Sequence, residues 1–381
     1  MVGTLNPLIG TTTPRSQSLE FIKTGTNNRH KKGVRGSFSN NMTIKSVQKA
    51  TITIANSTAS NTATISTVDT TRSVVFFNGC TTTNTTAFDA SFAYVDLTNA
   101  TTVTATRSTS AVATAITVEV TVVEFYSTFV DSVQQGTVAI TSTNTSATAT
   151  ITAIDTARSA VVMQGFMATS TGLASCLPTI VLTNSTTVTA NRTGSLSSTL
   201  TVGFTVIQFA SGVVNSVRLV SVSSSTTATT VTATITSVNT ANSIVLWNGQ
   251  QENSTSYIDT ALNYVDLTNS TTVTFTRTNG TSSPSRTLKA TVVEFKSGII
   301  KSKQTGTTVL NNVTSNTSTV TSVDTSKSLL NWCAFSYSGT SSDFRSAMAS
   351  AVLTNATTIT AAKNTAGTNT STPAWELVEF N

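Results

Sequence analysis

Apolar residues and hydroxyl-bearing residues alternate with a period of two over much of the chain. Residues 103–106 (VTAT) show the alternation, and short apolar runs such as residues 74–77 (VVFF) indicate strands that are buried on both faces. Thr, Val and Ile favour a pleated, half-buried surface. The pattern therefore predicts short antiparallel β-strands separated by turns.

One stretch of this pattern occurs four times. The motif VDLTNATTVTATR begins at Val95, and its three copies begin at Ile180, Val265 and Ala351. Successive copies lie about 85 residues apart, which indicates four copies of one folding unit. We expect each copy to form a single alternating strand, whose inward face carries the residues that correspond to Leu97, Val103 and Ala105.

Other positions recur with the same spacing. An Asp or Asn that can fix a turn through its own backbone stands at Asp69, Asp155, Asn239 and Asp324. A basic residue closes each motif, and Glu or Gln stands near the end of each repeat, so we expect these two positions to pair across neighbouring strands. The segments between the buried run and the motif differ most between repeats, for example residues 78–93 and 248–263. They are either sites of specificity or neutral surface loops.

This organisation predicts an all-β protein of four tandem antiparallel β-sandwich repeats, immunoglobulin-like or Greek-key in type, with seven or eight strands each. A small jelly roll or barrel remains an alternative for each unit. Only short joints separate the repeats, so we expect a stiff array. The predicted boundaries are 1–41 for an extended arm and 42–127, 128–212, 213–298 and 299–381 for the repeats.

Charge is concentrated before the repeats. Residues 1–41 contain six basic residues and one acidic residue, Glu20, although only 10% of the whole chain is charged. The predicted partner-binding residues of this arm are Arg15, Arg29, His30, Lys31, Lys32 and Arg35. Such asymmetry is typical of a tail that attaches to a partner. Nucleic acid is disfavoured as that partner because no recognisable reading module accompanies the basic run.

The residues required for common catalytic sites are missing from the repeats. The single histidine is His30 in the arm, and no metal, nucleotide or cofactor motif occurs. The cysteines Cys80, Cys176 and Cys333 stand at unmatched positions and are expected to be free, buried thiols. Paired carboxylates for glycoside hydrolysis are a disfavoured alternative, with the candidates Asp89, Asp96, Asp259 and Asp266. We therefore expect no enzyme activity, no cofactor and no metal site.

Together the marks SVQ, DTxRS or DTxKS, LTNxTTVTAxR and VVEF resemble repeats in virion proteins of tailed bacteriophages, over residues 44–380. The resemblance implies a structural protein of the tail, a fibre or the head decoration, which the arm attaches to other virion proteins as a homo-oligomer or symmetric assembly. The N-terminus has no signal-peptide pattern and no apolar stretch could span a membrane, so synthesis in the host cytoplasm is expected. The alternative function is binding of a host-surface glycan through the variable segments.

Overall fold

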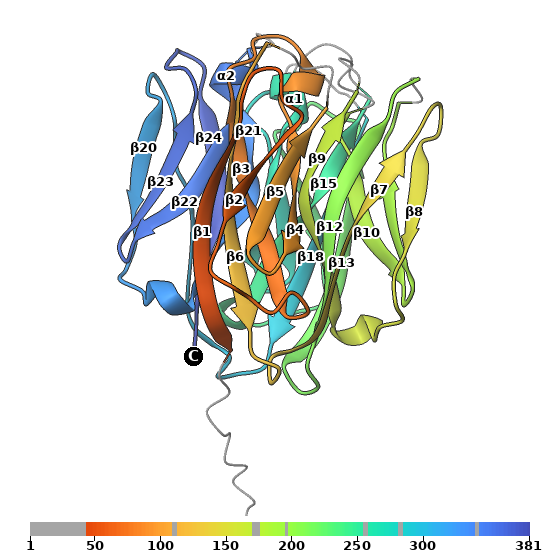
Figure 1. Ribbon diagram of the computed structural model, residues 1–381, viewed down its shortest axis with the longest axis vertical. Coiled ribbons are helices and arrows are strands. Elements are labelled where there is room, and N and C mark those ends of the chain that lie inside the picture. Colours follow the sequence, from red (N-terminus) through yellow and green to blue (C-terminus); the bar gives the residue numbers. More distant parts are fainter. Residues whose placement is uncertain are drawn as a thin grey trace, which may run out of the picture. The chain divides into compact units, whose positions relative to one another are not determined.

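The β-branched residues of every repeat form strands in the computed structural model of the chain. The structure describes residues 43–108, 113–169, 176–194, 197–253, 258–280, 285–339 and 343–381. Within these ranges each repeat supplies six strands, fewer than the seven or eight that were expected. The strands of a repeat run alternately in opposite directions between the two ends of the folded unit (Figure 1).

The strands have closely similar lengths in the four repeats. Those of repeat 1 are β1 (Ile44–Ile54), β2 (Ser60–Thr64), β3 (Ser73–Thr82), β4 (Ala93–Asn99), β5 (Thr102–Arg107) and β6 (Ile116–Phe125). Those of repeat 2 are β7 (Val130–Ile140), β8 (Ser146–Thr150), β9 (Ser159–Ala168), β10 (Thr179–Asn184), β11 (Thr187–Asn191) and β12 (Leu200–Phe209). Those of repeat 3 are β13 (Val214–Ser224), β14 (Thr230–Thr234), β15 (Ser243–Glu252), β16 (Tyr264–Asn269), β17 (Thr272–Thr276) and β18 (Arg286–Phe295). Those of repeat 4 are β19 (Ile300–Thr307), β20 (Ser315–Thr319), β21 (Ser328–Tyr337), β22 (Ala349–Asn355), β23 (Thr358–Lys363) and β24 (Ser371–Phe380).

Within the described ranges, the helices are single turns. Between the third and fourth strands of a repeat lie η1 (Phe88–Ala90), α1 (Ile258–Ala261) and α2 (Phe344–Ala347). Before the third strand lie η2 (Thr156–Arg158), η4 (Thr240–Asn242) and η5 (Thr325–Lys327). Each of the second group begins directly after the recurring Asp or Asn, whose side chain accepts a hydrogen bond from the backbone two residues on.

Every six-stranded sheet combines strands from two repeats. The orders are β1-β6-β3-β22-β23-β20, β13-β18-β15-β10-β11-β8, β2-β5-β4-β9-β12-β7 and β14-β17-β16-β21-β24-β19. In each sheet the fourth strand of one repeat pairs with the third strand of the next, and β22 of repeat 4 pairs with β3 of repeat 1. The repeats therefore close into a ring, and we call each of these junctions a seam.

A left-handed residue at each seam lets the two strands approach. Gly79, Gly165 and Gly249 have φ values of +89°, +86° and +93°, and Ala334 has the same conformation in repeat 4 with φ 69°. A Cβ on Gly79 would lie 2.3 Å from the backbone oxygen of Ala349 in the neighbouring repeat. Glycine is required there because it lacks the atom that would keep the strands apart.

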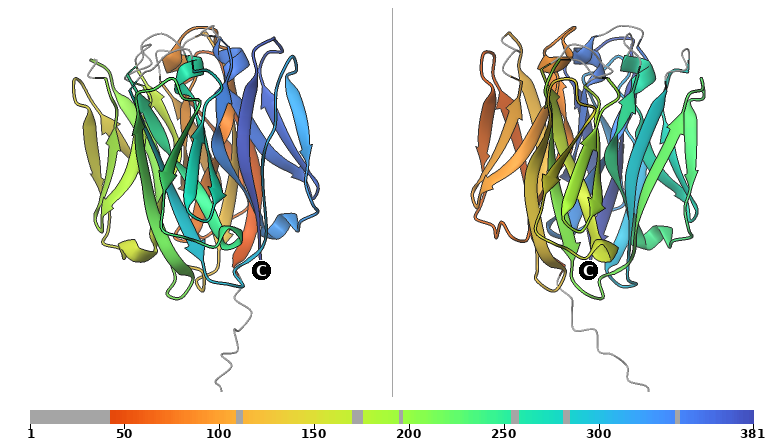
Figure 2. Two further views of the ribbon diagram at one scale, coloured as in Figure 1. Left: turned by 180° about the vertical axis from the view of Figure 1, so that it is seen from behind. Right: turned by 90° about the vertical axis from the view of Figure 1, so that its right-hand side faces the viewer.

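The four sheets surround a common centre like the blades of a four-bladed propeller (Figure 2). The predicted all-β class is confirmed, but an immunoglobulin-like sandwich for each repeat is not. The expected row of separate units is not observed either. The described residues of the four repeats belong to one compact unit, and its sheets cross the repeat boundaries. The repeats share sheets because the segment between the third and fourth strands of each repeat leads these two strands into different sheets.

The recurring LTN motif is a hairpin rather than the single strand that was expected. In repeat 1 it forms β4 and β5, and the turn between them begins at Asn99. The Asn99 side-chain oxygen accepts a hydrogen bond from Thr101 N at 2.9 Å, and the same bond occurs in the other three repeats. The prediction of an inward face is confirmed, because Leu97, Val103 and Ala105 are all buried.

Two sets of apolar contacts hold the ring together. One fills the space between the two half-sheets of each repeat, and the other gathers residues of all four repeats near the centre. The doubled apolar pair before Glu124 serves both sets, since Val122 belongs to the first and Val123 to the second. Strand β6 is therefore buried on both faces.

Candidate binding face of the ring

The two ends of the ring differ in construction. The end at which sixth strands lead into first strands is called the joint end here, and it contains the joints at residues 126–129, 210–213 and 296–299. The opposite end is called the variable end, because η1, α1 and α2 in the variable segments lie there (Figure 1). The described part of the ring begins and finishes at the joint end.

The joint end is built from the same contacts in all four repeats. In repeat 1 the Asp69 carboxylate accepts a hydrogen bond from Thr71 N at 2.9 Å, so the predicted turn is confirmed. The Glu124 carboxylate in turn accepts from Asp69 N at 3.1 Å, and Gln208, Glu294 and Glu379 do the same in their repeats. Hydrogen bonds from the hydroxyls of Thr71 and Ser326 lower the pKa of Asp69 and Asp324 below the usual values of carboxyl groups. Burial raises the pKa of Glu379, but its hydrogen bonds from Lys301 and from the backbone of Asp324 outweigh burial and lower that pKa overall.

The basic residues that close each LTN motif do not pair with these acids, contrary to expectation. Arg107 lies at the variable end, 1% exposed, and donates to the backbone oxygens of Thr58 and Ala55, both at 2.9 Å. Arg192, Arg277 and Lys363 likewise donate to backbone carbonyls. These side chains therefore donate to the carbonyl groups of turns at the variable end. Glu124 and its equivalents lie at the opposite, joint end of the ring.

The centre of the joint end is a closed aromatic cluster. Phe129 lies between 5.2 and 5.7 Å, centroid to centroid, from four other rings, those of Phe125, Phe209, Phe295 and Phe380. All five side chains are at most 3% exposed. The cluster joins the ends of all four repeats in one apolar contact.

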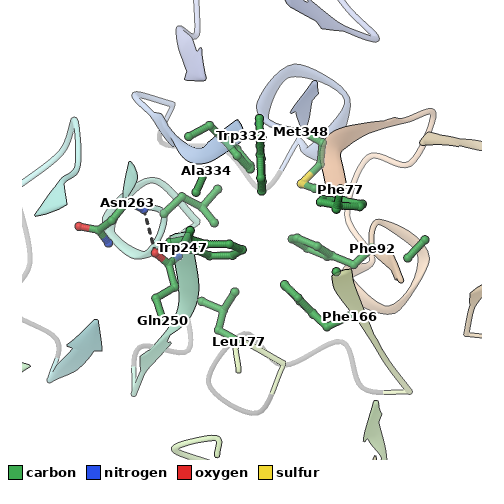
Figure 3. Close-up of a pocket in the computed structure, with 14 residues that line it drawn as sticks. Phe77, Phe92, Phe166, Leu177, Trp247, Gln250, Asn263, Trp332, Ala334 and Met348 are labelled. Atoms are coloured by element: carbon green, nitrogen blue, oxygen red, sulfur yellow. Dashed lines mark hydrogen bonds between the residues drawn. The ribbon is translucent and has the colours of Figure 1, made fainter. Parts of the chain in front are cut away.

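The centre of the variable end instead contains a cavity with aromatic walls (Figure 3). Its lining includes Phe77, Phe92, Phe166, Trp247, Trp332 and Phe335. The indole N–H groups of Trp247 and Trp332 have no hydrogen-bond partner among the described residues. The cavity leaves about 20 Å³ for the centre of a water molecule, which is room for one water and not for a sugar or a cofactor.

Side-chain amides join the third strands of neighbouring repeats around the centre. Asn78 donates to Leu330 O at 3.0 Å, Gln164 donates to Val75 O, and Asn248 donates to Val161 O. Repeat 4 has Cys333 at this position, and Asn331 makes the equivalent bond to Val245 O at 2.7 Å.

The seam between repeats 3 and 4 also contains a buried ion pair. The Lys303 ammonium lies 2.6 Å from Glu376, and their side chains are 8% and 1% exposed. Lys303 donates to Ser243 O at 2.7 Å, and the Glu376 carboxylate accepts from Val245 N at 2.8 Å. Both charged residues therefore bind the backbone of β15 in the neighbouring repeat.

Two hollows lie along this seam. A cavity of about 110 Å³ is lined by Asp266, Cys333 and Glu376, and an open groove of about 680 Å³ is lined by turn residues such as Asn239 and Asn269. Burial and the Glu376 carboxylate raise the pKa of Asp266, and burial raises the pKa of the Cys333 thiol well above its usual value. A thiol that stays protonated is a poor nucleophile, so this cavity has no evident covalent chemistry.

The four candidate acids for glycoside hydrolysis do not gather at one place in the ring. Asp89 and Asp96 belong to repeat 1, whereas Asp259 and Asp266 belong to repeat 3, which is not adjacent to repeat 1 in the ring. All three cysteines are buried and form no disulfide, as predicted. The described ranges contain no group of three or more His, Cys, Asp or Glu side chains that could hold a metal ion. No helix within them is long and apolar enough to cross a membrane.

The predicted arm residues Arg15, Arg29, His30, Lys31, Lys32 and Arg35 lie outside the described residues, and their role stays a prediction. The polar seam between repeats 3 and 4 was missed from the sequence. Its signal was that repeat 4 has Lys303 and Glu376 where repeat 1 has Val47 and Thr121.

No protein-family model matches the chain, and no curated protein is similar enough in sequence to be matched as a relative.

Proposed function

We propose that the protein is a non-enzymatic structural component of a tailed-phage virion. Its arm would attach the ring to the capsid or tail, and the variable end would face outward. The single observation that carries the proposal is the separation of roles along the ring. Residue 43, where the arm joins the ring, lies at the uniform joint end, and the variable segments gather at the opposite end.

Several features of the ring support a structural role. The repeats share all four sheets, apolar side chains of all four repeats fill the centre of the joint end, and hydrogen bonds hold both the turns and the seams. A protein built in this way resists local opening, since each repeat is held by two neighbours. Such rigidity suits a particle component that must position one face at a constant distance from its attachment site.

Neutralising the basic cluster in the full chain tests the attachment. The test variant carries Arg29→Gln, Lys31→Gln, Lys32→Gln and Arg35→Gln, and the control variant carries Lys296→Gln and Lys301→Gln at the joint end of the ring. Purified particles are then assayed for the protein by quantitative mass spectrometry. We expect the test variant to fold normally but to be lost from particles, while the control is incorporated. Normal incorporation of the test variant would contradict the attachment role.

The second candidate is recognition of a host-surface glycan through the variable segments. Their collection on one face is the observation that favours it. Against it, the central cavity of that face is only large enough for a water molecule. A ligand would therefore have to lie across the surface loops.

The two candidates separate in a binding assay with the purified full chain. Asp343, which precedes α2, and Arg345 within it form a partly exposed ion pair of the variable end, and Asp69 and Arg72 form a comparable pair at the joint end. Binding to host cells that is lost on Asp343→Ala with Arg345→Ala, and kept on Asp69→Asn with Arg72→Gln, would favour glycan recognition. Absence of binding by the unaltered protein would leave the structural role as the better account.

A further inference from the structure

Repeat 3 places a charged pair inside its variable end where the other repeats have neutral residues. Glu252 on β15 and Arg286 on β18 are partners across neighbouring strands, and they are 0% and 1% exposed. The corresponding pairs are Thr82 with Ile116, Ala168 with Leu200, and Tyr337 with Ser371. Burial of two charges is costly, so a position that carries them in one repeat alone calls for an explanation.

The charged pair contacts the single helical turn of the variable segment. Thr260 on α1 donates a hydrogen bond to the Glu252 carboxylate at 3.3 Å, and the backbone oxygen of Thr260 accepts one from Arg277 at 2.9 Å. Asp259, the neighbouring residue on α1, is 1% exposed and accepts a hydrogen bond from Asn279. The position of α1 therefore depends on the charges beneath it.

Among the described residues, this cluster contains two unpaired acceptors and one unpaired donor, the Nε of Arg286. One carboxylate oxygen of Glu252 and one of Asp259 are buried and have no hydrogen-bond partner among the described residues. No ion pair within 4.0 Å joins Glu252 to Arg286 there, because Arg286 donates to Asn263 and to Ala228 O, each at 3.2 Å. Two unpaired buried acceptors are unfavourable, and a proton bound to one of them converts it into a donor.

We propose that Glu252 is the proton-binding element of a latch that couples the packing of α1 to the protonation of this one carboxyl group. In the protonated state Glu252 donates to the unpaired oxygen of Asp259 and holds α1 against the repeat. When the proton leaves to solvent, Glu252 can no longer donate to Asp259 and α1 is released. The latch adds a pH response to the variable end. This proposal does not depend on the proposed virion function.

The charges around Glu252 place this change near neutral pH. Burial raises the pKa of Glu252 to about 7, Arg286 and Arg277 oppose that rise, and Asp259 adds to it. These three groups face Glu252 from β18, from the segment after β17 and from α1. Burial, with a smaller effect from Arg277, also lowers the pKa of Arg286 to about 10, so the arginine stays charged throughout this range.

Two measurements on the full chain test the latch. The first follows glutamate side-chain carboxyl carbons by NMR from about pH 4.5 to 9, with Glu252→Gln to identify the signal. The second compares hydrogen-exchange protection of residues 258–263 at about pH 5.5 and 8.5, corrected for intrinsic exchange rates. We expect a titration near pH 7 that the variant lacks, and about tenfold lower protection at the higher pH in the unaltered protein alone. Titration below about pH 5.5, or protection that does not change, would overturn the proposal.

The other repeats supply a matched control. The double variant Glu252→Thr with Arg286→Ile installs the neutral pair of repeat 1, and its exchange protection should not depend on pH. Glu294→Gln, at the joint end of the same repeat, should leave the pH response of residues 258–263 unchanged. If the variants fail to fold, the titration of the unaltered protein still decides between the outcomes.

Discussion

At the joint end the four repeats form their turns with the same hydrogen bonds, whereas at the variable end equivalent positions carry different residues in each repeat. In every repeat the joint-end turn before the third strand uses an Asp or Asn and a Glu or Gln that accept backbone hydrogen bonds. At the variable end, equivalent buried positions hold Thr82, Ala168, Glu252 and Tyr337. The difference shows that the ring's geometry is set at one end and leaves the other free to vary.

The largest effect should come from the aromatic cluster at the joint end. Phe129→Ala removes the ring that contacts four others, so we expect a loss of about 4 kcal/mol in the free energy of unfolding. Phe92→Leu at the variable end should cost only about 1 kcal/mol, because repeats 2 and 3 already have Leu177 and Leu262 at that position. Guanidinium unfolding measures both, and an equal loss would contradict the division between the ends.

The next effect is a pH dependence confined to the variable end. Burial raises the folded-state pKa of Glu252 to about 7 from its ordinary value of 4.5, so its contribution to stability is fully present below about pH 4.5 and is lost as the pH rises through 7. The difference corresponds to about 3 kcal/mol. The unfolding free energy of the unaltered protein should therefore fall relative to that of Glu252→Gln from about pH 5 to 8. A constant difference between the two would show that this carboxyl does not titrate in the folded ring.

A smaller effect is expected from a single turn of the joint end. Asn99→Ala removes the acceptor for Thr101 N and should cost about 1 kcal/mol. The equivalent substitution Asn355→Ala should cost about the same, since the turn has the same geometry in repeat 4. Thermal unfolding can compare the two, and a clear inequality would mean that the joint end is less uniform than its contacts indicate.

The smallest effect concerns the one seam that lacks a glycine. Ala334 has φ 69°, where the other three repeats have glycine. Ala334→Gly should relieve a strained conformation and raise the unfolding free energy by at most about 1 kcal/mol. Gly79→Ala, the reverse change at an equivalent seam, should destabilise the ring, because the new Cβ meets a backbone oxygen at 2.3 Å. Destabilisation by Ala334→Gly would argue against strain at this position.

The sequence predicted the strands and the four-fold repeat because periodicity and turn chemistry are local. It did not predict the ring, because β4 of one repeat pairs with β9 of the next, and the sequence pattern within a single repeat does not indicate this pairing. A partial signal was present in Gly79, Gly165 and Gly249, which recur at one position. Ala334 breaks that pattern, and the segments around it differ enough to be interpreted as loops.

The errors within a repeat have the same origin. The LTN motif keeps its alternation through the turn at Asn99, so a hairpin and a single strand give the same pattern. The Glu252 cluster depends on a strand register that places Arg286 opposite Glu252, and no short stretch of sequence contains both residues. Patterns within one strand could be predicted, whereas contacts between distant strands could not.

The pairing of Ser350 with Gly79 has a consequence for how the protein is made. During synthesis the N-terminal repeats leave the ribosome first and can build the sheets they share with their immediate successors. One sheet, however, needs β22, β23 and β20 of repeat 4 beside β3 of repeat 1, so it must wait for nearly the whole chain. Until then the edge of β3 stays open, and a nascent chain could pair it with a second molecule in place of its own last repeat.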